Sequence, residues 1–156
     1  MNTTDRPTVR CLAPGEGRAV RIGTHEVSHK ASSAAGTGYS IAELRIQPGK
    51  GAALHSHPRE ETLYVLSGEL DVLGETGVVA RACAGAVVHV PGRALHGFVN
   101  AGETPARALS IGSLEQQSFF DDMAAATSGG APDAEAVNAV SARHQVEYHD
   151  RAKARR

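Results

Sequence analysis

The chain has 156 residues, of which 41% are hydrophobic and 21% are charged, and its formal net charge is −1 at pH 7. These values are typical of one soluble globular domain, and so small a charge gives no long-range attraction to nucleic acid or to a membrane surface. No stretch reaches the roughly 18 apolar residues of a membrane span, and the N-terminus lacks the apolar run of a signal peptide. Basic residues concentrate only in the tail 151–156, RAKARR, which we expect to be solvated. We therefore expect no nucleic-acid and no membrane partner.

The two cysteines, Cys11 and Cys83, are far apart in the sequence and form no CxxC pair. In a chain without an export signal this pattern favours two reduced thiols. We therefore expect a cytoplasmic protein.

Short segments with period-two alternation, separated by glycine and proline, dominate the chain between residues 18 and 113. Around Ala42–Ile46, apolar residues alternate with charged and polar ones, and Pro48-Gly49 ends the segment. The segment 28–38 is small and polar, which favours a connecting loop over a lid. Seven or eight short strands at this spacing indicate an antiparallel sandwich or barrel. Further strands are expected at Thr62–Leu66, Glu69–Leu73, Val78–Ala82, 85–92, 96–100 and 106–113.

The pattern changes after Leu114. The stretch LEQQSFFDDMAAAT predicts a helix with Leu114, Phe119 and Met123 near one face. A second helix is predicted over 133–148, with Asp133 as its N-cap. The sequence thus predicts a β domain over 1–114, helices over 115–150 that pack on it, and the basic tail.

One cluster carries the chemistry of the sequence. His55, His57, Glu60 and Glu61 lie within seven residues. His55 and His57 are separated by one residue, so on an extended segment they point to the same side. Neutral imidazole is the commonest transition-metal ligand, and a nearby carboxylate would complete much of the coordination sphere. Alternation alone does not choose between Glu60 and Glu61.

The spacing around this cluster resembles a known family. The segment 49–68 matches the first motif of the cupin superfamily, G(x)5HxH(x)3–4E(x)6G, at every defined position: Gly49, His55, His57, Glu61 and Gly68. The segment 85–100 fits the frame of the second motif, G(x)5PxG(x)2H(x)3N, through Gly85, Pro91, His96 and Asn100. Arg93 stands where the family usually has glycine, and Pro91-Gly92 could still form the corner of a type II turn.

The resemblance implies an all-β fold, a small antiparallel jelly-roll (cupin) β-barrel with a short helical C-terminal extension. It also implies one divalent transition metal per chain, held by His55, His57, Glu61 and His96. Iron, manganese, nickel, cobalt, copper and zinc all suit three imidazoles and one carboxylate. The alternative is a metal-free cupin in which these residues are ordinary core or surface groups.

Other residues receive weaker assignments. Three are candidates for a substrate pocket: His89, Arg93 and Phe98. For His89 the alternative is a barrel-wall histidine, and for Arg93 a solvated turn residue. Phe119 and Phe120 are expected in the core, on a helix that could close one barrel mouth. We expect the remaining histidines to lie on the surface: His25, His29, His144 and His149.

Within the superfamily, the chain is similar to the small bacterial quercetin 2,3-dioxygenase-like proteins. This resemblance implies an oxygenase that acts on a phenolic or enolic small molecule with dioxygen, in which Glu61 is both a ligand and the base. A redox-neutral cyclase or isomerase of a polyketide-like substrate is the first alternative, and a non-catalytic small-molecule-binding module is the second. A homodimer is expected by resemblance alone.

Overall fold

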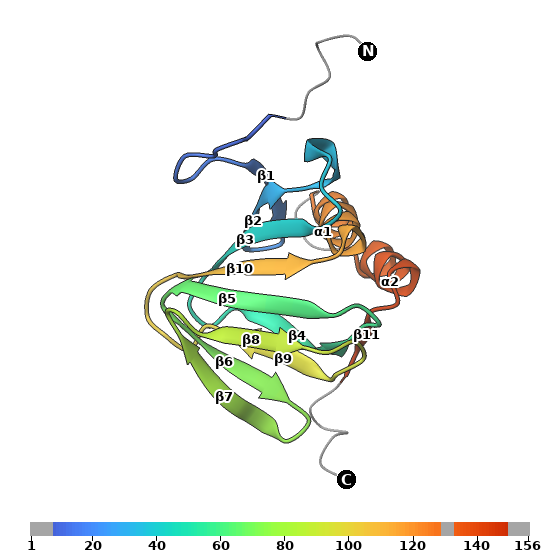
Figure 1. Ribbon diagram of the computed structural model, residues 1–156. Helices are drawn as coiled ribbons and strands as arrows, with labels where there is room; N and C mark the ends of the chain where they lie inside the picture. The colour runs from blue at the N-terminus through green and yellow to red at the C-terminus, as the bar shows by residue number, and fades with distance from the viewer. Residues whose placement is uncertain (1–7, 129–132, 150–156) are drawn as a thin grey trace.

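The computed structural model describes residues 8–128 and 133–149, and the basic tail lies outside these ranges. Within the described residues, antiparallel strands form two sheets, which are followed by two helices (Figure 1). The first sheet has the order β1-β2-β3-β10-β5-β8, and the second β11-β4-β9-β6-β7. The elements are β1 (Arg18–Ile22), β2 (His25–Ala31), β3 (Ser40–Ile46), β4 (Gly51–Ser56), β5 (Glu61–Ser67), β6 (Glu69–Gly74), β7 (Gly77–Cys83), β8 (Val87–Val90), β9 (His96–Val99), β10 (Ala106–Gly112), α1 (Leu114–Ala126), α2 (Ala134–Arg143) and β11 (Glu147–Tyr148).

The core lies between the two sheets. In β3, buried Ala42, Leu44 and Ile46 alternate with Glu43 and Arg45, because successive side chains of a strand point to opposite faces. The same alternation in β2, β5, β6 and β10 fills the space between the sheets with aliphatic side chains. The antiparallel jelly-roll with a short helical C-terminal extension that the sequence predicts is confirmed.

The helices close one end of this barrel. Figure 1 shows α1 and α2 together beside the ends of β3 and β10. Asp133 caps α2 as predicted, because its side chain accepts a hydrogen bond from the backbone N–H of Glu135 at 3.0 Å. Arg18 in β1 forms an ion pair of 2.8 Å with Asp121 in α1, which ties the first helix to the first sheet. No helix among the described residues combines the length and the apolar character needed to cross a membrane.

Two segments differ from the sequence prediction. The segment 28–38 is not all loop, because β2 continues to Ala31 and a 3-10 helix follows over Ser33–Ala35. The second helix ends at Arg143, and Gln145 has a φ of 54°, which turns the chain back toward the barrel. Glu147–Tyr148 then form β11, which pairs with Ser56 and His55 of β4. A strand of two residues is too short for periodicity to reveal.

Candidate metal centre

Three histidines from two neighbouring strands meet at the end of the barrel. His55 lies near the end of β4, His57 directly follows that strand, and His96 begins β9. The pairing of β4 with β9 places His55 opposite His96. One ring nitrogen from each of these buried histidines lies within 4.8 Å of the others. The structure therefore brings together the three histidines of the two sequence motifs.

The main chain fixes the orientation of all three rings. Each Nδ1 lies within hydrogen-bond distance of a carbonyl oxygen two residues away: His55 with Ala53 at 2.7 Å, His57 with Arg59 at 2.8 Å, and His96 with Ala94 at 2.9 Å. A carbonyl only accepts, so each Nδ1–H donates, and the neutral form of such a ring has its lone pair on Nε2. Metal-bound histidines usually have such a partner on the other nitrogen.

The electrostatic state of the cluster suits a metal ligand. Burial, followed by the neighbouring His96, lowers the pKa of His55 to about 4, so this imidazole is neutral at pH 7. His96 Nε2 is buried and has no hydrogen-bond partner among the described residues. An unpaired acceptor in a buried site is costly unless something binds it. The histidines therefore fit a divalent transition metal and are close enough to hold one.

Glu61, the first residue of β5, lies beside two of the three histidines, whereas Glu60 is exposed. Glu61 Oε2 lies 3.6 Å from His57 Nε2 and 3.7 Å from His96 Nε2. Its other oxygen, Oε1, accepts hydrogen bonds from Ser110 Oγ at 2.9 Å and from Gln116 Nε2 at 2.7 Å. Burial alone would raise the pKa of Glu61. Hydrogen bonds from His57 and His96 in their protonated forms, and from Ser110, outweigh burial and hold the pKa well below its ordinary range.

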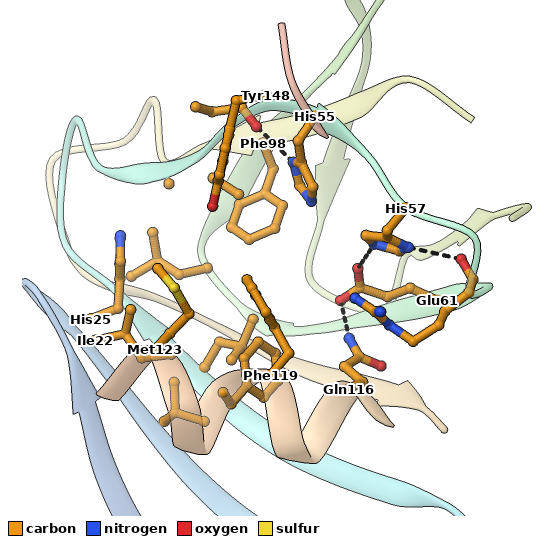
Figure 2. A pocket seen from close by; sticks show the side chains of 18 residues that line it. Ile22, His25, His55, His57, Glu61, Phe98, Gln116, Phe119, Met123 and Tyr148 are labelled. Carbon is orange, nitrogen blue, oxygen red and sulfur yellow. Dashed lines mark hydrogen bonds and ion pairs between the residues drawn. The ribbon is translucent and has the colours of Figure 1, made fainter. Parts of the chain in front are cut away.

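A cavity of about 300 Å³ opens onto this cluster. In Figure 2, His57, Glu61 and Gln116 lie at one end of the cavity, and His25 and Ile22 lie at the other. Between the ends the wall is mainly apolar, and α1 supplies much of it. The apolar lining residues are Ile22, Val27, Leu44, Ile46, Gly51, Ala52, Ala53, Phe98, Phe119, Phe120 and Met123.

The three residues expected at a substrate pocket fall in different places. Phe98 is buried and lines the cavity. His89 is exposed on β8, within 3.3 Å of the Thr62 hydroxyl, and is not among the lining residues. Arg93 is also exposed and off the cavity wall, but its backbone N–H donates to the carbonyl of His57 at 2.6 Å.

The turn at Arg93 differs from the one expected. The hydrogen bond from the Ala94 N–H to the Pro91 carbonyl, 3.1 Å, makes Arg93 the third residue of the turn. Arg93 has a φ of 68°, and Gly92 is not among the residues with positive φ. The left-handed position is therefore Arg93 itself, where the family motif has glycine, and not the displaced Gly92.

The surface assignment is wrong for His29 and His25, and the side chain of His144 is also only 10% exposed. His29 is 3% exposed and packs beside Phe120, with its Nε2 3.2 Å from Asp121. His25 lines the cavity. His25 and His29 lie on the same face of β2 as buried Val27, so the period-two alternation of this strand is the signal that could have found them.

Sequence reasoning also missed three polar residues of the cavity wall. Arg59 follows the histidine pair, and its guanidinium donates to the His144 carbonyl at 2.7 Å and lies 5.8 Å from the centre of the Phe119 ring. Tyr148 comes from β11, and its ring lies 5.9 Å from that of His55. Gln116 reaches Glu61 from α1. No motif signals these residues, because their positions depend on how the C-terminal segment packs.

Residues 42–112 match the family model described as Cupin domain. Among solved structures, the polyketide cyclase RemF from Streptomyces resistomycificus is similar at a TM-score of 0.62 and 19% identity, over 69% of this chain and 80% of that one. An RmlC-like cupin from Shewanella frigidimarina is similar at a TM-score of 0.57 and 19% identity, over 72% of this chain and 96% of that one. A sugar phosphate isomerase of the cupin superfamily from Silicibacter pomeroyi is similar at a TM-score of 0.51 and 24% identity, over 57% of this chain and 59% of that one.

No curated protein matches the sequence. Identities of 19 to 24% establish the fold and leave the activity open. The two motifs, the antiparallel barrel and the family match agree on the same segment. Residues 42–112 therefore match the cupin domain model, and the chain has the jelly-roll fold of the solved cupin structures.

Proposed function

We propose that this protein is a metal-dependent enzyme that oxygenates a small, largely apolar molecule bearing a phenol or enol oxygen. One observation carries the proposal: His55, His57 and Glu61 line an otherwise mainly apolar cavity, and His96 completes the group of three close imidazoles beside it. Such a donor set suits a divalent transition metal, and the apolar wall suits a ring or chain with few polar groups. The resemblance to quercetin dioxygenase-like proteins supports the choice of reaction.

The residues around the cavity have different proposed roles. His55, His57, His96 and Glu61 would hold the metal, which when bound supplies Lewis-acid and redox chemistry toward the substrate oxygen and dioxygen. Phe98 and the apolar side chains of α1 would orient the substrate and exclude water.

We assign the transfer of the substrate's hydroxyl proton to Glu61. Because Ser110 and Gln116 occupy Oε1, both proposed roles of Glu61, ligand and base, fall to Oε2, the oxygen turned toward the histidines. The lowered pKa makes this carboxylate a weak base, which suits a substrate hydroxyl whose own pKa is lowered by contact with a bound metal.

A redox-neutral cyclase or isomerase is the second candidate. His25, Arg59 and Tyr148 place further polar groups around the same cavity. Several polar groups spread along the wall suit a substrate with several oxygens, such as a polyketide-like chain. In this case a metal that acts only as a Lewis acid, zinc for example, is sufficient.

Metal analysis of the purified protein, combined with dioxygen uptake on a panel of phenols and enols, tests both candidates. Near-stoichiometric iron, manganese, nickel, cobalt or copper with substrate-dependent uptake supports the oxygenase. Bound zinc and product formation without uptake support the second candidate. The His55→Ala/His57→Ala double variant is the control and should lose metal in either case.

Two results would overturn the enzyme proposal. A wild-type protein that binds no divalent metal even after reconstitution contradicts the metal centre. A wild-type protein without turnover, whose small-molecule binding survives both His55→Ala and Glu61→Ala, is a binding module. We also propose a homodimer, which light scattering coupled to size-exclusion chromatography tests independently.

A further inference from the structure

The carboxylate of Glu61 has two oxygens with different surroundings. Oε1 accepts from Ser110 Oγ at 2.9 Å and from Gln116 Nε2 at 2.7 Å, whereas Oε2 faces His57 and His96. Gln116 Nε2 also donates to Ser110 Oγ at 2.7 Å, so the three side chains form a closed triangle. All three are buried, at 5% exposure for Gln116, 1% for Ser110 and 7% for Glu61.

The hydrogens in this triangle are fully assigned. The two N–H groups of the Gln116 amide donate hydrogen bonds to Glu61 Oε1 and to Ser110 Oγ, and the single O–H of Ser110 donates to Glu61 Oε1. The opposite amide orientation would place the amide oxygen against a carboxylate, and the two acceptors would repel each other. Only one orientation of Gln116 is therefore compatible with an ionised Glu61.

From this geometry we infer that Gln116 is a positioning residue of the metal centre: it holds Oε1, so that Oε2 is the oxygen presented beside the histidine nitrogens, and thereby raises the metal affinity. The inference rests on the proposed metal-dependent function. Figure 2 shows Gln116 projecting from α1 toward Glu61, opposite His57. Without the amide, the carboxylate of Glu61 can rotate and lose this alignment.

The inference also links the metal site to the helix. Gln116 is the third residue of α1, and the same helix supplies Phe119 and Met123 to the cavity wall. The amide reaches Glu61 only while α1 is seated on the barrel. Metal affinity therefore depends on a segment outside both cupin motifs.

The test compares Gln116→Leu with Gln117→Leu. Gln117 is the adjacent residue of the same helix, is also buried at 8% exposure, and contacts Ser33 and Asp121 instead of Glu61. For each variant we would measure the dissociation constant of Co²⁺ by competition with a chelator, and the visible absorption spectrum of the Co²⁺ form. The spectrum reports ligand geometry, which a purely structural role of Gln116 would leave unchanged.

We expect Gln116→Leu to weaken Co²⁺ binding by about 10- to 100-fold and to shift the absorption bands, as for other residues that orient metal ligands. Gln117→Leu should keep the wild-type affinity and spectrum. Gln116→Met removes the same donor with an apolar side chain of similar length, which keeps the test valid if Gln116→Leu fails to fold. Wild-type affinity and spectrum in Gln116→Leu, or in Gln116→Met where the first variant does not fold, would overturn the inference.

The two proposals fail in distinguishable ways. If the wild-type protein binds no Co²⁺, the metal centre and the inference both fall. If the wild type binds Co²⁺ and Gln116→Leu binds it equally well, the proposed function stands and only the role of Gln116 is refuted.

Discussion

The histidines and the glutamate of the candidate metal centre are held by contacts of different range. Each histidine donates through Nδ1 to a carbonyl oxygen two residues away in the chain. Glu61 is held by Ser110 and Gln116, which are 49 and 55 residues away. The histidine half of the site is thus set by the local path of the main chain. The carboxylate half depends on the pairing of β5 with β10 and on the seating of α1.

Because the two halves are held by contacts of different range, mutations can destroy the metal centre in two ways. A change within a histidine segment removes a ligand or its local anchor, while the carboxylate keeps its partners. A change in β10 or α1 leaves every ligand in the sequence but releases the carboxylate. The Gln116 variants act on the carboxylate half, and the following ones act on the histidine half or on the turns beside it, in order of decreasing effect.

The largest effect is expected from His57→Ala, which breaks the local half. Removing one imidazole should abolish tight metal binding, and with it the stabilisation that metal gives by mass action, about 4.1 kcal/mol at a metal concentration of 1,000 Kd. Scanning calorimetry with and without divalent metal measures this difference as a change in Tm. His89→Ala, which removes an exposed histidine outside the cavity, is the matched control and should keep the full metal-dependent rise. A metal-dependent rise in Tm that persists in His57→Ala would contradict the ligand assignment.

Acid should weaken the metal-free protein through His55. The pKa of His55 is about 4 in the folded chain because of burial, against about 6.5 when unfolded, so the unfolded state takes up the proton first as the pH falls. The contribution of this residue to stability is therefore full above about pH 6.5 and falls by about 3 kcal/mol as the pH drops to about 4. Urea unfolding at pH 7 and pH 4.5 in the presence of a chelator measures the loss.

His55→Asn is the comparison for this pH dependence and should reduce it between pH 4 and 6.5, while His25 and His29, whose pKa values burial also lowers, keep their part. Direct observation of the His55 ring by nuclear magnetic resonance adds a second measurement. A His55 that titrates near its ordinary pKa would show that burial does not control its charge.

Asn100 belongs to the second motif but is not a metal ligand, so its substitution separates loss of stability from loss of metal affinity. Its buried side chain donates to the carbonyls of Ile46 and Thr104 and accepts from the Gly102 N–H, at 2.8 to 2.9 Å. Asn100→Ala should lower the free energy of unfolding by about 2 kcal/mol, since main-chain groups lose their partners. Measured in parallel, the Co²⁺ dissociation constant of the folded variant should stay at the wild-type value. A selective loss of metal affinity would instead give Asn100 a role in the centre.

The smallest effect is a gain in stability at Arg93. Its φ of 68° lies in the left-handed region, which costs a non-glycine residue about 1 kcal/mol. Arg93→Gly should raise the free energy of unfolding by somewhat less than that, about 0.5 kcal/mol, because glycine also gains freedom in the unfolded chain. Arg93→Ala keeps the strain and should give no gain. Chemical denaturation of both variants decides the point, and equal stabilities would refute the strain.

The sequence was informative where local spacing controls structure. The motif spacings select His55, His57 and His96, because their rings are anchored within the same short segments. Spacing also favours Glu61 over Glu60, which is exposed. The jelly-roll follows from short alternating strands between regular turns, although some strand boundaries and β11 were not predicted.

Contacts between distant segments could not be predicted in the same way. Gln116 and Tyr148 reach the site only because α1 and β11 pack against the barrel. The alternation in β2 places His29 on the buried face, but it does not show that Phe120 and Asp121 of α1 cover it. No periodicity within one segment encodes which face of another segment it will meet.

The main-chain anchors of the histidines also bear on how such a site can diversify. The anchoring oxygens belong to Ala53, Arg59 and Ala94, and the side chains of these residues take no part in the anchoring hydrogen bonds. Arg59 illustrates the separation, because its carbonyl orients His57 while its side chain lines the cavity. Substitution at such a position can alter what the cavity accepts without disturbing the imidazoles. Proteins that diverge from one such barrel can therefore change substrate specificity while the three histidines keep the same geometry.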